Sequence, residues 1–482
     1  MKKTIYLVLT MALSLPALNS CRDESLDPTL QQSKDLETNI NTVEDLNAVL
    51  NAGYNRLSGV AYYGRDYIIF GEIRSDNTFS NSNSNRFVSP GRMDLTVNDA
   101  YAADTWAAIY ATIATANVVI GKDAAAITEG TTAEINQLKG EAYIMRALGH
   151  FDLLKLYGQQ HVTAGGDPTM GVPYVTTFRD QENILPSRNT VEEVRKMVMD
   201  DLNTALGLMT NAGNRNSHYF TSHAANALMA RVALYFKDYA TAETAAKKVI
   251  DAGYQIASKD SFAATFNTDN TKNQIFSVAA SPTDNLGING LANIYQDTSY
   301  GDVVATKNLV DIFEETDIRG EGREEEVDEN DEVVVEGIKG MINFDGRFYR
   351  NVGKYPSKDP YKDDIPVIRI EEVILIYAEA LLQNGKAPLA LVELNKIPAN
   401  RGASLYTAAT LDNILLERRK ELAFEGFRFY DLARTGKAIP KVDIGQTFGD
   451  TDLPYGSYNY AFPIPATERG ANSNVAQNFG YE

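Results

Sequence analysis

Apolar residues recur at helical spacing along much of this chain. In residues 106–120, Trp106, Ile109, Tyr110 and Ile113 follow one another at steps of three and four. This spacing gathers apolar side chains on one face of a helix and leaves the other faces to water. The same pattern predicts a mainly α-helical protein with further helices at residues 43–57, 138–157, 191–209, 223–236, 241–252, 371–383 and 388–396. Gly158 is expected to end the 138–157 helix at the C′ position.

Two of the predicted helix pairs look like tetratricopeptide units. In residues 233–253, the small Ala233, Ala242 and Ala246 would let two antiparallel helices approach closely. The second pair, residues 371–396, turns at Gly385 and restarts with Pro388 in its first turn. Helix pairs of this kind bury their apolar faces by stacking, so a stacked helical body is expected.

Between the predicted helices the chain is rich in Gly, Pro, Asn, Asp and Ser. Residues 71–100, 159–189, 257–310 and 436–482 have this composition, which predicts irregular loops with short strands. Residues 314–336 form an acidic block that is expected to be a solvated loop. Its run 328–336 has alternating carboxylates, but the sixth position of an EF-hand loop is not glycine, so no calcium site is predicted.

The first twenty residues are predicted to be an export signal. Lys2 and Lys3 precede an uncharged apolar run at residues 5–18, which is too short for a membrane span. Cys21 is the single cysteine, and residues 18–21 resemble a bacterial lipobox. By that resemblance Cys21 would become a diacylated N-terminus, and residues 22–24 would act as a tag for surface export. The protein is thus expected to be anchored by lipid rather than to span the membrane.

Charge and aromatic content narrow the possible partners. The 482 residues carry a net charge of −19, which argues against nucleic acid and against polybasic binding to anionic lipid. The aromatic set of 26 Tyr and 19 Phe contains a single tryptophan, Trp106. Because Trp106 falls on the apolar face of a predicted helix, its ring is expected in the core. Any surface that stacks on a ligand must therefore use Tyr or Phe.

Motifs for catalysis, metals and cofactors are missing from the sequence. The four histidines, His150, His161, His218 and His223, lack the spacing of a zinc site and are expected to be structural. Neither a G-x-S-x-G elbow nor a phosphate-binding loop occurs. We therefore predict no cofactor, no metal and no enzyme activity. No carboxylate pair stands out for glycoside hydrolysis, so a hydrolase remains the less favoured alternative.

Charged and apolar residues are most densely mixed in residues 417–436, ERRKELAFEGFRFYDLARTG. Such density places charges against apolar surface, where a charge is tolerated only when it is paired and hydrogen-bonded. A ligand clamp is one interpretation. The favoured one is an internal lattice of arginines and carboxylates that locks helices together.

Several motifs in order resemble those of the SusD/RagB family. They are GEIRSDNT (71–78), the spacing of Trp106, Tyr110, Ile113 and Asn117, RALGHFDLLKLYG (146–158), IPVIRIEEVILIYAEALLQNG (365–385), NKIPANRGA (395–403) and FPIPATERGANSNVAQNFGYE (from 462). The resemblance implies a mainly α fold, in which tetratricopeptide-like pairs form an α–α superhelix beside a loop-rich lobe with short strands. It also divides the chain into a signal peptide (1–20), a lipidated tether (21–42), an N-terminal helical region (43–260) and a C-terminal region (261–482).

The resemblance further implies a function at the cell surface. Members of the family are non-catalytic receptors on the outer membrane that partner a SusC-like TonB-dependent transporter and usually take glycans. The predicted function is therefore capture of an oligosaccharide and its delivery to such a transporter. A peptide receptor of the same fold is the second hypothesis.

The predicted ligand site lies on two loops, residues 79–92 and 285–301. Sugar recognition needs amide and guanidinium groups for hydroxyls and an aromatic face for the C–H side of the ring. Both loops contain such residues, and Tyr62, Tyr63 and Tyr67 are further candidates. The predicted ligand-binding residues are Phe79, Asn81, Asn83, Asn85, Arg86, Phe87, Tyr295 and Tyr300.

Overall fold

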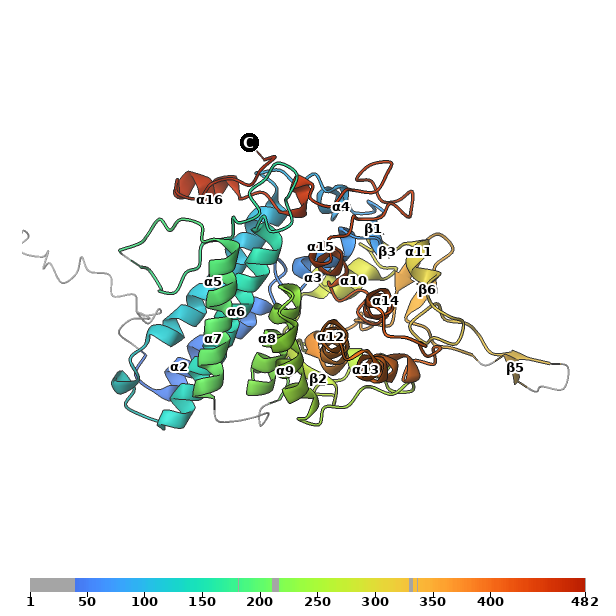
Figure 1. The fold of residues 1–482 in the computed structure, drawn as a ribbon, viewed down its shortest axis with the longest axis horizontal. Coiled ribbons are helices and arrows are strands. Elements are labelled where there is room, and N and C mark those ends of the chain that lie inside the picture. Colours follow the sequence, from blue (N-terminus) through green and yellow to red (C-terminus); the bar gives the residue numbers. More distant parts are fainter. Residues whose placement is uncertain (1–39, 181, 210–215, 329–332, 336, 482) are drawn as a thin grey trace, which may run out of the picture.

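The computed structural model describes residues 40–481 except 181, 210–215, 329–332 and 336. The chain is mainly α-helical, as predicted (Figure 1). Its α-helices are α2 (Val43–Leu57), α3 (Asp66–Ile73), α4 (Val88–Arg92), α5 (Ala100–Gly121), α6 (Thr132–Tyr157), α7 (Val191–Leu208), α8 (Ser222–Tyr235), α9 (Tyr239–Ile250), α10 (Leu291–Tyr295), α11 (Lys307–Val310), α12 (Ile370–Gln383), α13 (Ala387–Ala399), α14 (Leu411–Glu421), α15 (Arg428–Arg434) and α16 (Ala466–Ala471). Its strands are β1 (Thr78–Ser80), β2 (Gln274–Val278), β3 (Val303–Ala305), β4 (Glu326–Val327), β5 (Val333–Val335), β6 (Ile342–Phe344), β7 (Tyr349–Asn351) and β8 (Ile365–Arg369).

Capping residues set the beginnings of the long helices. Thr42, Thr131 and Thr190 are the N-caps of α2, α6 and α7, and each forms a capping box with the acidic residue three positions later. The helices α5 and α6 begin six residues before their predicted starts, where the apolar pattern is weaker. Gly158 ends α6 as predicted, with an extended backbone at φ −74° and ψ 150°.

Stacked helix pairs form one side of the molecule, as the tetratricopeptide pattern predicts. Helix α8 packs against α9, α9 against α12, and α12 against α13, and α5, α6 and α7 continue the array (Figure 1). Ala233, Ala242 and Ala246 are all buried, which lets α8 and α9 approach closely. The fold is thus an α–α superhelix with a loop-rich lobe.

Short strands hold the loop-rich lobe together. The main sheet is antiparallel with the order β1-β3-β7-β6, and β2 pairs separately with β8. In the main sheet, Ser80 of β1 lies opposite Val303 of β3. The acidic block 314–336 is less irregular than expected, because β4 and β5 pair within it as a two-stranded hairpin.

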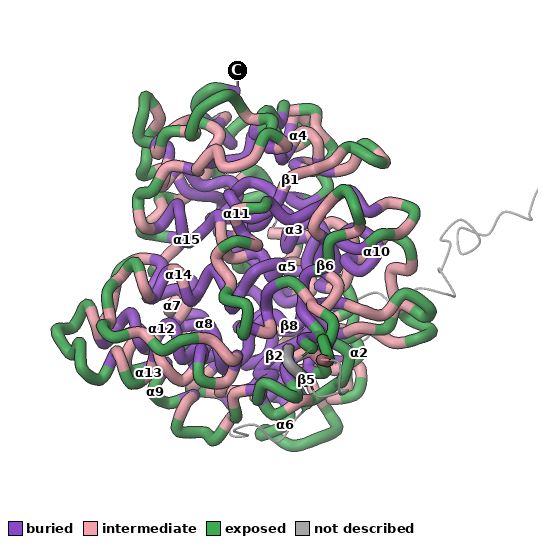
Figure 2. The backbone as a smooth tube through the Cα atoms, turned by 90° about the vertical axis from the view of Figure 1, so that its right-hand side faces the viewer, coloured by how far each residue is buried: buried purple, intermediate pink, exposed green. Residues whose placement is uncertain are grey.

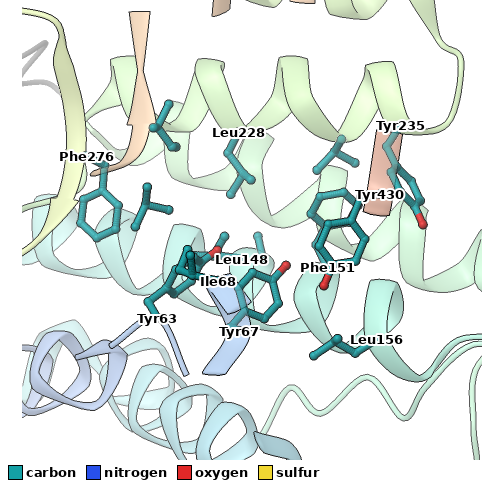
Figure 3. Packing of buried hydrophobic residues seen from close by; sticks show 14 of the residues in the cluster. Tyr63, Tyr67, Ile68, Leu148, Phe151, Leu156, Leu228, Tyr235, Phe276 and Tyr430 are labelled. Atoms are coloured by element: carbon teal, nitrogen blue, oxygen red, sulfur yellow. The ribbon is translucent and has the colours of Figure 1, made fainter. Parts of the chain in front are cut away.

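Buried backbone runs through the interior of the molecule (Figure 2), and many of the buried side chains are aromatic (Figure 3). Trp106 is 5% exposed, which confirms its predicted place in the core. Tyr62, Tyr63 and Tyr67 are buried too, and their hydroxyls donate to the carboxylate of Asp152 at 2.7, 2.9 and 2.5 Å. The suggestion that these three tyrosines contact a ligand is therefore wrong.

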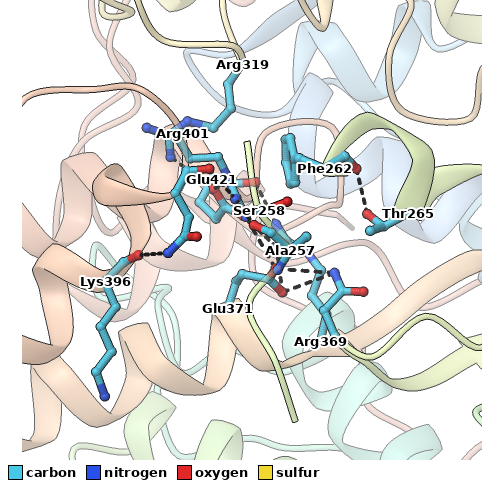
Figure 4. A network of polar contacts seen from close by, with 12 residues as sticks. Ala257, Ser258, Phe262, Thr265, Arg319, Arg369, Glu371, Lys396, Arg401 and Glu421 are labelled. Carbon is cyan, nitrogen blue, oxygen red and sulfur yellow. Dashed lines mark hydrogen bonds and ion pairs between the residues drawn. The ribbon is translucent and has the colours of Figure 1, made fainter. Parts of the chain in front are cut away.

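Charged residues of the 417–436 segment form a buried lattice with other parts of the chain (Figure 4). The carboxylate of Glu421 accepts hydrogen bonds from the guanidinium groups of three arginines. The N···O distances are 2.6 Å for Arg369, 2.8 Å for Arg401 and 3.0 Å for Arg319. Although burial alone raises the pKa of Glu421, the guanidinium groups of Arg401, Arg369 and Arg319 hold it well below its ordinary value. The structural interpretation of this segment is confirmed.

The same segment also contacts residues 71–76, in the N-terminal part of the chain. Arg428 contacts the carboxylate of Asp76 at 2.6 and 2.8 Å, and Arg419 adds a second cation to that carboxylate at 3.3 Å. At Gly71, an added Cβ would lie 2.0 Å from the carbonyl oxygen of Gly426. Glycine is therefore required where α3 crosses the turn between α14 and α15.

Candidate ligand-recognition site

The two loops predicted to bind ligand meet beside the main sheet. Because β1 and β3 are antiparallel, the end of β1 lies beside the beginning of β3. The loop that follows Ser80 and the loop that precedes Val303 therefore leave the sheet at the same end of these strands. The backbone N–H of Asn81 donates to the carbonyl of Asp302 at 2.8 Å, and the amide of Asn81 donates to the carbonyl of Gly301 at 2.9 Å. The amide of Asn83 donates to the carbonyl of Tyr300 at 2.6 Å.

Asp302 fixes the conformation of residues 81–86. Its buried carboxylate accepts the backbone N–H of Ser84 at 2.8 Å and that of Arg86 at 3.2 Å, and also the hydroxyl of Ser84. The loop needs this support because Ser82 and Asn85 both have a φ of 61°, which is unfavourable for residues with a side chain. The Ser/Asn-rich loop is therefore ordered by a buried acid.

Arg86 and Tyr300 form the centre of the site. The guanidinium carbon of Arg86 lies 3.5 Å from the centre of the Tyr300 ring, and its Nη1 donates to the hydroxyl of Ser84 at 2.7 Å. Within the described residues, no carboxylate forms an ion pair with Arg86. Donors of a half-buried, stacked arginine thus remain for hydroxyl groups of a ligand.

Six of the eight predicted residues lie where the two loops meet, at positions that are not fully buried. We name this group the loop cluster. Asn83 and Asn85 are exposed, while Phe79, Asn81, Arg86 and Tyr300 are half-buried. The ring of Phe79 packs edge to face against Phe348 at 6.2 Å, which limits what it can offer a ligand.

Phe87 and Tyr295 are corrections to the predicted site, because neither ring is exposed. Phe87 stacks on Tyr101 with ring centres 5.0 Å apart. Tyr295 lies parallel to Tyr355 at 6.3 Å, and its hydroxyl donates to the carbonyl of Phe424 at 3.3 Å. Both aromatic residues belong to the core beneath the loops and cannot stack on a sugar.

A cavity of about 90 Å³ lies beside the 285–301 loop, and we name it the side cavity. Sequence reasoning missed it, because its walls come from three segments that are far apart in the chain. It is lined by Ser58, Gly64, Val278, Ala279, Ala280, Asp284, Asn285, Leu286, Gly287, Gly290, Leu291, Ala292, Tyr355, Ser357, Tyr361, Asp363 and Ile365.

Buried Asn293 connects the side cavity with the loop cluster. Its carbonyl accepts the N–H of Gly301 at 2.9 Å, and its amide donates to the carbonyl of Ile288 at 2.7 Å. The hydroxyl of Tyr361 lies 3.5 Å from its side-chain oxygen. One residue thus supports both a wall of the side cavity and the segment that carries Tyr300.

The four histidines are structural, as predicted. His150 is buried, accepts the N–H of Val175 at 2.9 Å and contacts the carbonyl of Arg146 at 3.0 Å, and burial lowers its pKa to about 3. His161 contacts the hydroxyls of Tyr235 and Tyr455, His218 pairs with Asp364, and His223 lies 3.3 Å from the hydroxyl of Tyr254. Across residues 40–481, with the gaps given above, no three potential ligands are grouped to hold a metal ion.

The proposed lipid-attachment residue, Cys21, lies outside the described residues. Among the helices that are described, none combines the length and the apolar composition needed to cross a bilayer.

Comparison with known proteins gives consistent matches along the chain. A family model described as starch-binding and associating with the outer membrane matches residues 26–234, and the SusD family model matches residues 351–481. A SusD-like protein P38 from Formosa agariphila is 27% identical over 91% of this chain and 92% of its own length. The starch-binding protein SusD of Bacteroides thetaiotaomicron is 34% identical over 28% of this chain and 25% of its own length.

Solved structures match over nearly the whole chain. A SusD superfamily protein from Bacteroides thetaiotaomicron has a TM-score of 0.78 and 28% identity, and the match covers 91% of this chain and 99% of that protein. A crystal structure described as a putative sugar-binding protein from Bacteroides vulgatus has a TM-score of 0.80 and 26% identity, covering 92% and 100%.

Proposed function

We propose that this chain, which belongs to the SusD/RagB family of binding proteins associated with the outer membrane, captures oligosaccharides at the cell surface and delivers them to a SusC-like TonB-dependent transporter. The observation that carries the proposal is the cluster of Arg86, Tyr300 and Asn83, held in place by Asp302. It combines an aromatic ring, amides and a guanidinium group that has no carboxylate partner in the described part of the chain, which is the set of groups that saccharide recognition requires.

Binding can be tested by calorimetry on the purified full chain. The probes are neutral hexasaccharides of glucose, xylose and mannose in several linkages, an oligogalacturonate of equal length, and a pool of peptides. We expect at least one saccharide to bind with micromolar to millimolar affinity, which suits a receptor that releases its ligand onward. Binding of peptides alone would replace the proposal by the second hypothesis, a peptide receptor of the same fold.

Attachment through a lipid on Cys21 is the part of the proposal that concerns localisation. The lipobox-like residues 18–21 support it. Cys21→Ser should release the protein from the membrane fraction of cells, because a single cysteine provides the only site for the thioether-linked lipid. The variant would remain in the membrane fraction if another segment provided the anchor.

Delivery to a transporter requires a physical complex. A tagged full chain, extracted from outer membranes in mild detergent, should co-purify with a transporter of the SusC type. Recovery of the tagged chain without such a transporter, under conditions that preserve other outer-membrane complexes, would contradict this step.

A receptor without catalytic activity is the favoured form of the proposal. Burial raises the pKa of Asp66 to about 6 and also raises the pKa values of Glu72 and Asp363, as expected for a catalytic acid. Asp363 is half-buried and held by the N–H and hydroxyl of Ser357, whereas Asp66 and Glu72 are only 3% and 0% exposed. The latter two lie beneath the surface, where a polysaccharide has no access. Appearance of shorter products after incubation with any bound saccharide would show hydrolysis instead.

A further inference from the structure

We infer that the side cavity is a second sugar subsite, adjoining the loop cluster, that accepts an uncharged sugar unit and excludes units bearing carboxylate or sulfate. The inference rests on the proposed function and deepens it by naming the ligand class. It is carried by the lining of the cavity, by an unpaired buried hydroxyl and by the connection through Asn293.

The lining of the side cavity is suited to a polyhydroxylated ligand. Tyr361 is half-buried and offers an aromatic ring, while Ser58, Asn285 and Ser357 offer hydroxyl and amide groups. Apolar residues such as Leu286 and Leu291 complete the wall. A sugar ring has both hydroxyl edges and apolar C–H faces, so a wall that mixes these groups is complementary to it.

Tyr355 provides the observation that points to a ligand. It is 1% exposed and lines the side cavity, and its hydroxyl has no hydrogen-bond partner among the described residues. A buried polar group without a partner is destabilising, which makes such groups uncommon unless a water or ligand completes them. Burial also raises the pKa of Tyr355 well above its usual value, so the group stays a protonated hydroxyl. The hydroxyl is covered by the wall of the cavity in the free protein, so an oxygen of a sugar would provide the missing acceptor after a small movement of that wall.

The charge of the lining favours an uncharged sugar. Asp284 and Asp363 are the charged residues of the lining, which contains no lysine, arginine or histidine. Asp363 is held in place by the N–H and the hydroxyl of Ser357, both at 2.6 Å. Lys362 is next to Asp363 in the chain and exposed, but it is not part of the lining. A carboxylate or sulfate in this cavity would face two like charges, which the exposed Lys362 beside Asp363 offsets only in part, whereas a hydroxyl can donate to either carboxylate.

The position of the side cavity makes it part of one extended site. Asn293 contacts the segment of Tyr300 on one side and Ile288 and Tyr361 on the other. An oligosaccharide that stacks on the loop cluster can therefore continue into the cavity. The two parts differ in charge, since the loop cluster presents Arg86 and the side cavity presents two carboxylates.

The test uses calorimetry on the full chain with the neutral hexasaccharides and the oligogalacturonate named above. Wild-type protein should bind a neutral member and bind the oligogalacturonate at least about tenfold more weakly. Tyr355→Phe, which removes one oxygen, should weaken neutral binding about tenfold, as expected for a lost hydrogen bond. Its thermal midpoint should not fall, because the removed hydroxyl has no partner in the free protein. Asp363→Asn should raise affinity for the oligogalacturonate.

Tyr481→Phe is the matched control. It also removes a buried tyrosine hydroxyl, but this one donates to the carbonyl of Ala461 at 2.8 Å and lies outside the cavity lining. It should lower the thermal midpoint and leave sugar binding unchanged.

The outcomes separate this inference from the proposed function. If no saccharide binds the wild type, the proposed function fails. If a saccharide binds and Tyr300→Ala weakens it, while Tyr355→Phe and Asp363→Asn bind as wild type does, the function stands and the second subsite is overturned. Oligogalacturonate binding as tight as that of the neutral sugar would overturn the exclusion of anions.

Discussion

The buried lattice around Glu421 and the loop cluster around Arg86 use the same groups in opposite ways. Both contain an arginine over an aromatic ring and a buried carboxylate. In the lattice, Arg401 is fully buried, lies 3.8 Å from the ring centre of Phe262 and pairs with Glu421 and Glu371. In the loop cluster, Arg86 lies 3.5 Å from the ring centre of Tyr300, and the nearby Asp302 carboxylate accepts backbone and hydroxyl groups instead.

This difference shows that the partner, not the residue type, separates a structural arginine from one available to a ligand. When an arginine has carboxylate partners on several sides, its charge and donors are used within the protein, and its removal leaves those buried carboxylates with one cation fewer and with acceptors unpaired. When its support comes from an aromatic ring and a hydroxyl, donors remain for another molecule. The comparison therefore predicts losses of stability in one region and losses of binding in the other.

The largest effect is expected from Arg401→Ala. Because Glu421 and Glu371 are fully buried, this substitution should lower the free energy of unfolding by about 3–5 kcal/mol. Denaturant unfolding followed by circular dichroism measures the loss. Arg86→Ala is the matched control in the loop cluster and should change stability by less than about 1 kcal/mol. Equal losses in the two variants would remove the distinction between the regions.

Acid should weaken the core. His150 has a pKa of about 3 in the folded protein, below its unfolded value, so the unfolded chain binds more protons as pH falls below about 6.5. We expect this one histidine to reduce the free energy of unfolding by about 2 kcal/mol between pH 6.5 and 5. The lowered pKa values of Glu421, Glu425 and Asp431 add a further loss below about pH 4.5.

Denaturant unfolding at several pH values measures this loss of stability. Because the raised pKa of Asp66 opposes this loss and the lowered pKa of His161 adds to it, the contribution of His150 is the difference between wild type and His150→Phe. If the two proteins lose the same free energy of unfolding from pH 6.5 to 5, His150 does not remain neutral in the folded protein.

Asp302→Ala should affect both stability and binding, which makes it an intermediate case. The variant leaves the N–H groups of Ser84 and Arg86 without their acceptor, so a loss of about 1–2 kcal/mol is expected. The free energy of saccharide binding should fall by more than this loss of stability, because the loop no longer holds Arg86 over Tyr300. Hydrogen exchange should show faster exchange confined to residues 81–86. Normal affinity in this variant would mean that the ligand itself orders the loop.

The smallest effect is expected from Tyr300→Ala. Loss of one stacking surface should weaken saccharide binding by about 0.5–1.5 kcal/mol, by analogy with aromatic pairs. The thermal midpoint should stay within the error of wild type, because the Tyr300 side chain is half-buried and its backbone contacts with Asn83 remain. Calorimetry and thermal melting on the same preparation check both expectations. A large fall in the melting temperature would place Tyr300 with the structural residues.

Periodic segments could be predicted from the sequence, because their structure depends on neighbouring residues. Residues 43–57 were predicted as a helix with the bounds that α2 has, and the capping box of Thr42 with Asp45 explains its beginning. The 417–436 segment was predicted as a structural lattice, because its charge density leaves few other solutions.

The exposure of loop residues could not be predicted in the same way. Phe87 and Tyr295 lie in polar segments that read like those of Phe79 and Tyr300, yet they belong to the core. Their burial depends on α4 and α10, helices of five residues each that carry no periodic signal. Asp302 and the side cavity were missed for a related reason. The role of Asp302 depends on the β1–β3 register, and the cavity depends on the meeting of segments near residues 58, 285 and 360.

The crossing of α3 with the turn at Gly426 has a consequence for dissecting the protein into pieces. Asp76 and Glu72 lie before the predicted region boundary at residues 260 and 261, while their partners Arg428 and the N–H of Gly426 lie after it. A protease that cut at the exposed residues 258–261 would sever the backbone but none of these contacts. The two fragments should elute together as one particle and separate only in denaturant. Expressed apart, each should remain insoluble until mixed with the other during refolding, which is the behaviour of complementing fragments rather than of independent modules.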